Sequence, residues 1–152
     1  MSPFDSTAWR AFHKIGQQLL PHLSRQISNH SGITSAEYSV LLSLHEAGEA
    51  TLTVNELATS LGWEISRMSH QVTRMHQNGL LKKVKNEVDC RCFDVSLTSE
   101  GRRVIARAIP LQSVEINHCF STILTKTQMQ TLIEISEVIS EHLATHHSSN
   151  AK

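Results

Sequence analysis

The chain has no long apolar run, and this absence excludes a membrane-spanning helix, which needs about 20 mostly apolar residues in succession. Its first residues, Met-Ser-Pro-Phe-Asp, lack the pattern of a secretory signal peptide. We therefore expect a cytoplasmic protein with no membrane partner. No internal repeat or low-complexity segment is visible, and 152 residues are enough for one domain with a substantial core.

The motifs that carry most enzyme chemistry are also missing. The chain has no Gly-rich phosphate loop, no nucleophile elbow and no pair of carboxylates in a plausible cleft. We predict that the protein is not an enzyme and that it uses no cofactor.

Metal-binding patterns are weak, because neither a CxxC nor an HExxH sequence occurs. Ten histidines are many for this length. His142 and His146 are four residues apart on one predicted helix face, and His118 adjoins Cys119, so a zinc site is conceivable. Ordinary surface or core histidines are the simpler interpretation, and we predict no metal site.

The chain also has no net charge, since fourteen basic residues balance fourteen acidic ones. The balance hides an asymmetry along the sequence. Residues 65–86 hold five Lys/Arg and no acid, whereas residues 115–147 hold four Glu and one Lys. A protein polarised in this way presents its positive end to DNA, so the zero sum does not exclude DNA binding.

The chain is organised around residues 53–97. The pattern predicts a helix that begins at Thr53 with a capping box to Glu56, a tight turn at Gly62, and a second helix that ends at Asn78 and Gly79. A two-stranded hairpin with a charged tip follows, and residues 50–53 could add a short strand to it. This order is typical of a helix-turn-helix with a wing.

The second helix predicts a buried stripe of Ile65, Met68, Val72 and Met75. Its other face combines hydroxyl, amide, imidazole and guanidinium groups, which can reach base edges and phosphates in a major groove. We expect Ser66, Arg67, His70 and Arg74 to read bases, and Ser69, Thr73 and Gln77 to contact phosphates. The alternative is a helix face that is simply exposed to solvent. The polar face lies on the second helix of a helix-turn-helix, however, and this position favours DNA binding.

The hairpin supplies further positive charge. Lys82, Lys83 and Lys85 precede its tip, and we expect at least one of them to meet backbone phosphate. Arg91 at the tip should enter the minor groove, where narrow A·T-rich tracts concentrate negative potential.

Two cysteines, Cys90 and Cys92, flank Arg91 in the wing. A positive neighbour can lower the pKa of a thiol, so their oxidation could disturb DNA docking. Two inert, reduced thiols are the simpler interpretation in a cytosolic protein. The sequence leaves open whether these cysteines or the histidines sense redox state or metal.

The run from Glu56 to Gly101, especially ELATSLG, SRMSHQVTRM, GLL, DCR and LTSEG, resembles the MarR family of bacterial winged-helix transcription regulators. The resemblance implies a homodimer that binds a palindromic operator and is released by a small ligand or by oxidation. It also implies that Asp89 pairs with an arginine to shape the wing tip. Two departures stand out: Glu64 occupies a position where many relatives carry a short hydroxyl residue, and residues 1–30 lack the cysteine of redox-sensing relatives.

The flanking segments carry apolar residues at helical spacing and predict long amphipathic helices. Pro21 should kink or split the first of them. Pro110 should bend the helix that follows the wing, which should run towards residue 122.

The expected fold is therefore mostly α (α+β): a winged helix-turn-helix with N- and C-terminal helices forming a dimerisation region. We assign residues 1–32 and 105–147 to dimerisation helices, 33–104 to the DNA-binding unit and 148–152 to a disordered tail.

A dimer would space two recognition helices about one DNA turn apart, roughly 34–36 Å, to fit a palindrome. The alternative is a monomer in which the outer helices fold back on their own chain. An effector pocket for a small aromatic or phenolic compound is expected where Trp9, His13, Tyr38, His45 and Trp63 gather, although these residues can equally form ordinary core.

The function predicted from the sequence is thus a sequence-specific transcription regulator, a repressor released by such a ligand. A metal- or redox-responsive regulator of the same fold, or a helical protein-interaction module without DNA binding, is the alternative.

Overall fold

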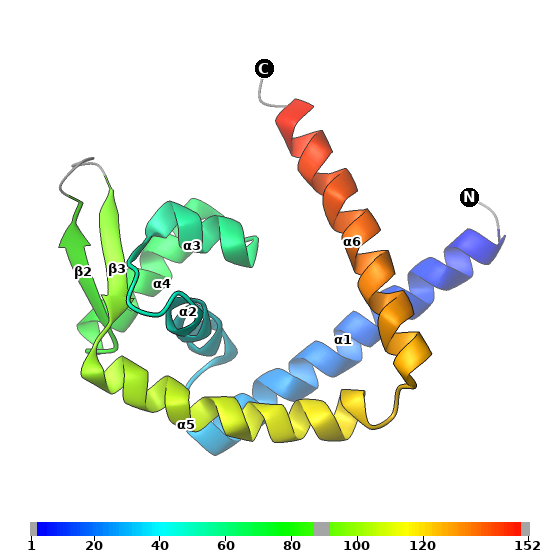
Figure 1. Cartoon of the computed structure of the whole chain (residues 1–152), viewed down its shortest axis with the longest axis horizontal. Helices are drawn as coiled ribbons and strands as arrows, with labels where there is room; N and C mark the ends of the chain where they lie inside the picture. Colours follow the sequence, from blue (N-terminus) through cyan, green and yellow to red (C-terminus); the bar gives the residue numbers. More distant parts are fainter. Residues whose placement is uncertain (1–2, 87–91, 150–152) are drawn as a thin grey trace. The chain divides into compact units, whose positions relative to one another are not determined.

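The structure, a computed structural model, describes residues 3–86 and 92–149. The chain forms two compact units, Met1–Glu115 and Ile116–Lys152. Helices and strands of the first unit follow one another as α1 (Pro3–Ser31), α2 (Ser35–Glu46), β1 (Leu52–Thr53), α3 (Val54–Leu61), α4 (Ile65–Gln77), β2 (Leu81–Lys85), β3 (Phe93–Leu97) and α5 (Ser99–Ile116) (Figure 1).

The predicted helix-turn-helix and wing are confirmed. Helices α3 and α4 pack on each other, and β2 and β3 form the antiparallel hairpin (Figure 1). Strand β1 pairs with β3 through Leu52 and Val95, which makes a three-stranded sheet in the order β1-β3-β2. The short strand expected before the first helix of the motif is therefore present.

The ends of the helices are capped as their sequences predict. Thr53 and Glu56 form a capping box at α3, where the Thr53 amide donates to the Glu56 carboxylate at 2.7 Å and the Glu56 amide donates to the Thr53 hydroxyl at 3.2 Å. Thr34 and Glu37 repeat this arrangement at α2. Helix α3 stops at Gly62, whose φ of +62° lies in the left-handed region that favours glycine.

The capping box predicts an acid-sensitive contribution of Glu56 to stability. The hydrogen bonds from Thr53 lower the pKa of the Glu56 carboxyl below its ordinary 4.5. Its stabilising effect is therefore complete above this ordinary value and is lost as pH falls through the lowered one. We expect Glu56→Ala to lower the free energy of unfolding by less than about 1 kcal/mol near neutral pH. Urea unfolding at about pH 7 and about pH 3 should show the difference from the unchanged protein shrinking in acid; an equal difference at both would contradict the assignment.

The core of the first unit lies between α2, α3, α4, the sheet and the start of α5. Its fully buried side chains are Val40, Leu41, Leu44, Leu57, Met68, Val72, Met75, Leu81, Val95 and Ile105. Burial of this apolar surface is the main stabilising contribution to the unit.

The predicted stripe of α4 is right at three positions and wrong at one. Met68, Val72 and Met75 are fully buried, whereas Ile65 is 57% exposed. Ile65 is the first residue of α4, so its side chain extends past the elements that cover the rest of the stripe. Gln71 takes the remaining buried position, with only 8% of its surface exposed.

The wing is joined to α5 by Thr98. Its amide donates to the carbonyl oxygen of Leu80, and its hydroxyl donates to that of Gly79 at 2.7 Å. The same hydroxyl accepts the amide of Gly101 at 2.9 Å, so Thr98 caps α5. This residue therefore ties the turn after the recognition helix to the next helix.

Helix α1 is continuous from Pro3 to Ser31, so of the two effects predicted for Pro21 the split is wrong, and the kink stays a prediction. A proline inside a helix removes one backbone hydrogen bond. Pro21 lies at the exposed side of the helix, and the loss does not interrupt it. Pro110 is likewise contained within α5.

The second unit continues from α5 through a short π-helix, Asn117–Ser121, into α6 (Lys126–Ser149). The helix expected to reach residue 122 thus changes type in its last turn. Thr125 and Gln128 cap α6, with the Gln128 amide donating to the Thr125 hydroxyl. Because α6 runs to Ser149, residues 148–149 are helical rather than part of a disordered tail; residues 150–152 lie outside the described part of the chain.

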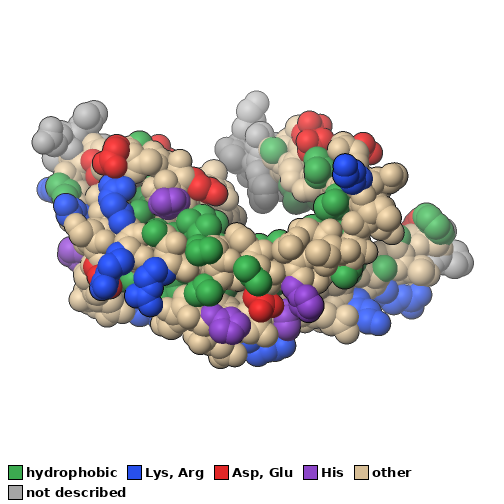
Figure 2. Space-filling view, turned by 60° about the horizontal axis from the view of Figure 1, so that its bottom comes forward, with side chains coloured by type: hydrophobic (Ala, Val, Ile, Leu, Met, Phe, Trp, Pro, Cys, Tyr) green, Lys and Arg blue, Asp and Glu red, His purple; other side chains and the backbone are tan. Residues whose placement is uncertain are grey.

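Several large apolar side chains stay uncovered in each unit. On α1, Trp9, Phe12 and Ile15 are between 56% and 58% exposed. On α6, the uncovered side chains include Leu132, Ile133, Ile135, Val138, Ile139 and Leu143. Figure 2 shows hydrophobic side chains lying bare among polar ones on one face of the molecule. In the described ranges no helix is long and apolar enough to cross a membrane.

Candidate nucleic-acid interface

Helix α4 turns a polar face away from the core. The seven residues predicted for this face all lie off the fully buried stripe; Ser69 and Thr73 are half-buried, and the exposed ones are Ser66, Arg67, His70, Arg74 and Gln77. No Asp or Glu occurs from Ile65 to Asn86, so nothing in this stretch opposes the approach of phosphate.

The first arginine of this face, Arg67, lies against an aromatic ring. Its guanidinium carbon is 4.1 Å from the centroid of the Trp63 ring, a direct cation–π contact. Trp63 stands in the turn between α3 and α4 and packs partly against the core. The sequence predicts Trp63 for an effector pocket and carries no signal for its contact with Arg67.

The second arginine, Arg74, is held by a neighbour on its own helix. Its Nη2 donates to the Oε1 atom of Gln71 at 2.6 Å. Within the described residues the Nε2 atom of Gln71 is buried without a hydrogen-bond partner. Gln71 is not among the predicted site residues, although its spacing of three from Met68 and four from Met75 places it on the buried side of α4.

Lys83 connects the wing to α4. Its Nζ lies 4.3 Å from the centroid of the Phe93 ring and donates to the Thr73 hydroxyl at 3.4 Å. The Lys83 side chain is half-buried, whereas Lys82 and Lys85 are exposed. One lysine of the wing is thus positioned beside the recognition helix, and two extend into solvent.

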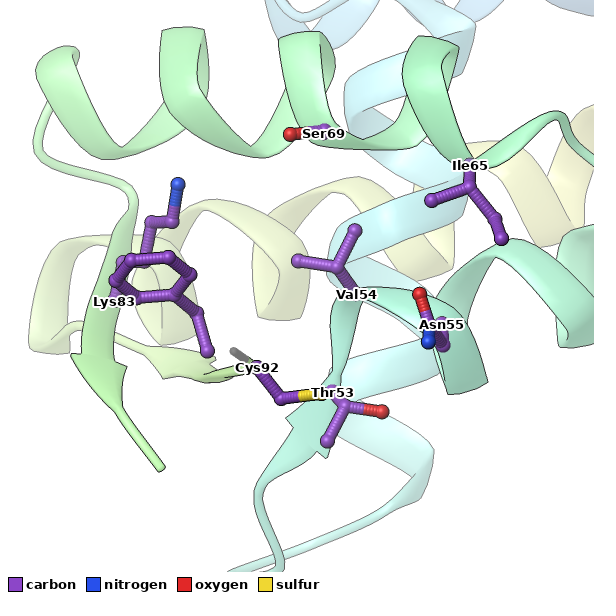
Figure 3. Close-up of a pocket in the computed structure, with 8 residues that line it drawn as sticks. Thr53, Val54, Asn55, Ile65, Ser69, Lys83 and Cys92 are labelled. Carbon is purple, nitrogen blue, oxygen red and sulfur yellow. The ribbon is translucent and has the colours of Figure 1, made fainter. Parts of the chain in front are cut away.

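An open hollow of about 420 Å³ separates the start of α4 from the wing. Its lining combines hydroxyl, amide and ammonium groups with apolar ones and consists of Thr53, Val54, Asn55, Ile65, Ser69, Lys83, Cys92 and Phe93. In Figure 3, Ser69 on α4 lies across the hollow from Val54, and Ile65 borders it at the start of the helix. The exposure of Ile65 is explained by this opening.

The tip of the wing carries two predicted contacts that cannot be placed. Asp89 and Arg91, together with Cys90, lie outside the described residues. Their roles in shaping the tip and in entering the minor groove stay predictions. Cys92 lines the hollow and is not in a disulfide.

Comparison with known proteins agrees with this geometry. A model of the MarR family matches residues 33–93. The HTH-type transcriptional repressor MdtR of Bacillus subtilis is 32% identical over 101 residues, which cover 66% of this chain and 61% of MdtR, less than two thirds of its length. The structure resembles Sco3205, a MarR family transcriptional regulator from Streptomyces coelicolor solved in complex with DNA. The TM-score is 0.89 and the identity 29%, over 94% of this chain and 93% of that one.

The chain belongs to the MarR family. A second regulator of the family from Streptomyces coelicolor, AbsC, has a TM-score of 0.88 and 26% identity over 95% of this chain and 97% of its own. MarR proteins are transcription regulators and not enzymes, as predicted, and this chain has their winged helix-turn-helix fold.

The five residues predicted for a MarR effector pocket fall into separate groups. Trp9 and His13 stack on α1 with ring centroids 5.9 Å apart, and among the described residues no ring contact joins them to the other three. Partial burial, with Glu46 adding to it, raises the pKa of the Tyr38 hydroxyl. His45 is exposed, and Trp63 stacks on Arg67. None of the five lines the hollow beside α4.

No metal site emerges in the part of the MarR chain that the structure describes. Groups of three or more His, Cys, Asp or Glu side chains able to hold an ion are absent there. The Nε2 atom of His22 lies 3.8 Å from the Glu115 carboxylate, which is a contact between α1 and α5.

Proposed function

We propose that this MarR regulator binds a palindromic operator as a homodimer, with α4 in the major groove and the wing over the adjacent minor groove. The observation that carries the proposal is the acid-free polar face of α4, on which Arg67 and Arg74 are exposed and both are held by uncharged partners. Arginine is suited to bidentate contact with guanine, so we assign base reading to these two, with Ser66 and His70 beside them. We assign phosphate contacts to Ser69, Thr73, Gln77, Lys83 and Lys85. We assign Arg91 to the minor groove, at a wing tip whose shape depends on the pairing of Asp89 with an arginine.

The homodimer is proposed because one chain leaves apolar helix faces uncovered. Ile139, near the middle of α6, is 46% exposed, and Trp9 on α1 is 58% exposed. Large apolar patches of this kind mark association surfaces in soluble proteins. Pairing α1 and α6 with their copies in a second chain, over residues 1–32 and 105–147, would cover both and set two recognition helices about one DNA turn apart.

We further propose that the protein acts as a repressor released by a small aromatic or phenolic compound. Its similarity to MdtR, a transcriptional repressor, supports the first part. The second part rests on Trp9, His13 and Tyr38, whose aromatic and polar groups suit such a ligand where a second chain supplies the remaining walls of a binding site. Release of bound operator DNA by phenolic carboxylates, followed by fluorescence anisotropy, tests it.

Selection of bound sequences from random duplex DNA tests the central proposal. The expected result is an inverted repeat whose half-sites are about one helical turn apart. Recovery of sequences without an inverted repeat would overturn the palindrome and the dimer, and failure to enrich any sequence would overturn specific recognition by α4.

The salt dependence of binding should identify Lys83 as a phosphate contact. Each phosphate that a cation neutralises adds about 0.9 to the slope of log affinity against log salt concentration. Lys83→Ala should therefore weaken binding to all sequences alike and reduce this slope by about 1. The control is Lys126→Ala on α6, which should leave the slope unchanged. An unaltered slope in the Lys83 variant would remove this lysine from the interface.

A further inference from the structure

The turn before the recognition helix fixes the backbone of Trp63, and the core supports its ring. The Trp63 amide donates to the Ala58 carbonyl oxygen at 2.9 Å, and Gly62 before it has a left-handed conformation. The ring packs partly against the hydrophobic core. One side of Trp63 therefore packs against the core. Arg67, four residues later in the sequence, places its guanidinium over the ring.

Arg67 has a second candidate partner, which it does not use. Glu64 stands three residues earlier, at a spacing that allows an ion pair on a helix. Glu64 is exposed and its carboxylate makes no capping bond. Among the ion pairs between described residues, none joins Arg67 to Glu64, and the guanidinium lies on the ring instead.

This arrangement matters for a residue that binds DNA. A carboxylate partner would occupy guanidinium N–H donors and offset the positive charge. An aromatic face attracts the cation but uses none of the five N–H donors at its edge. Lying over the Trp63 ring, the guanidinium keeps both its charge and its N–H donors for the duplex. A side chain that is already ordered also loses less conformational freedom on binding.

We propose that Trp63 is a positioning residue of the DNA interface: its ring orients the Arg67 guanidinium, charged and with its donors unoccupied, for contact with DNA. This inference rests on the proposed function, because it assumes that Arg67 contacts DNA. Under this proposal DNA recognition depends on Trp63 through Arg67, without a contact between Trp63 and the bases.

A double-mutant cycle on the full-length protein tests the inference. Trp63→Leu should weaken binding to the selected duplex about two- to fivefold, the range for a cation–π contact at an exposed site. Trp63→Phe retains an aromatic face and should restore most of the loss. In an Arg67→Ala background, Trp63→Leu should cause no further loss.

Arg74 supplies the matched control, because it is held by Gln71 and not by the ring. In an Arg74→Ala background, Trp63→Leu should cause its full loss. Thermal unfolding of each variant checks that the winged helix is intact. Independently of DNA, the side-chain protons of Arg67 should show an upfield ring-current shift by NMR, which Trp63→Leu abolishes.

The outcomes separate this inference from the function on which it rests. If Arg67→Ala leaves DNA binding unchanged, the assignment of Arg67 to the interface is wrong, and the inference fails with it. If Arg67→Ala weakens binding but Trp63→Leu weakens it equally with and without Arg67, Trp63 acts on the fold alone. That result, or no effect of Trp63→Leu, overturns the positioning role and leaves the proposed function in place.

Discussion

Replacing Ile139 by Glu should convert the protein into a monomer and lower its affinity for operator DNA about 100-fold or more. Ile139 lies near the centre of the uncovered apolar face of α6, between Ile135 and Leu143. A carboxylate at this position would have to be desolvated in the proposed interface without a partner, which is costly. A monomer binds one half-site at a time, and the gain from linking two half-sites is on the order of 100- to 10,000-fold.

Thr127→Glu is the matched control for this variant. Thr127 is exposed in the first turn of α6, where an added carboxylate suits the helix dipole. It introduces the same charge away from the apolar face, so the dimer and the DNA affinity should persist. Light scattering gives the mass and anisotropy gives the affinity. A dimeric Ile139→Glu protein would show that α6 does not hold the two chains together.

The helix boundaries of this fold were predictable because they depend on local chemistry. The capping boxes at Thr34, Thr53 and Thr125 use residues three positions apart, and Gly62 and Gly79 stop helices in conformations with positive φ. Such signals act within one turn of chain. No information from distant segments is needed to recognise them.

Two positions on α4 show where this reasoning ends. The apolar spacing predicts a buried Ile65, which is 57% exposed, and it includes no polar residue, whereas Gln71 is buried. Helical spacing alone places Gln71 on the buried side, whereas the exposure of Ile65 depends on how far α3 and the wing extend over the first turn. A tertiary boundary of this kind is not encoded in the periodicity of one helix.

The sequence predicted which residues form the candidate site, but not which neighbouring side chains hold its cations in place. The polar face of α4 followed from the sequence, yet the partners of its cations did not: Trp63 for Arg67, Gln71 for Arg74, and Phe93 for Lys83. Two of these partners lie outside α4, in the preceding turn and on β3. All three are uncharged, so each cation is ordered without being neutralised, and its full charge stays available to phosphate.

Gly101→Ala should destabilise the protein by about 3 kcal/mol, the upper end of the usual range for overpacking in a core. Gly101 is buried in the first turn of α5. A Cβ atom there would meet the backbone carbonyl of Leu80, and it would also lie 3.4 Å from a methyl group of Leu97. The Leu80 carbonyl cannot move aside, because it accepts the Thr98 amide that ties the wing to α5. The LTSEG pattern is thus explained by a close approach of two backbones.

Thermal unfolding measures the effect, and a fall in midpoint of about 6–12 °C corresponds to this loss. Gly16→Ala is the contrasting variant. Gly16 is also helical, but apart from its own neighbours on α1 no atom of the described residues lies within 4 Å of a Cβ there. Alanine in a helix is favoured over glycine by about 1 kcal/mol, so Gly16→Ala should be neutral or stabilising. If both variants changed the free energy of unfolding by the same amount, the effect at Gly101 would reflect helix propensity alone. The packing of the Gly79–Leu80 turn against α5 would then not require a glycine at position 101.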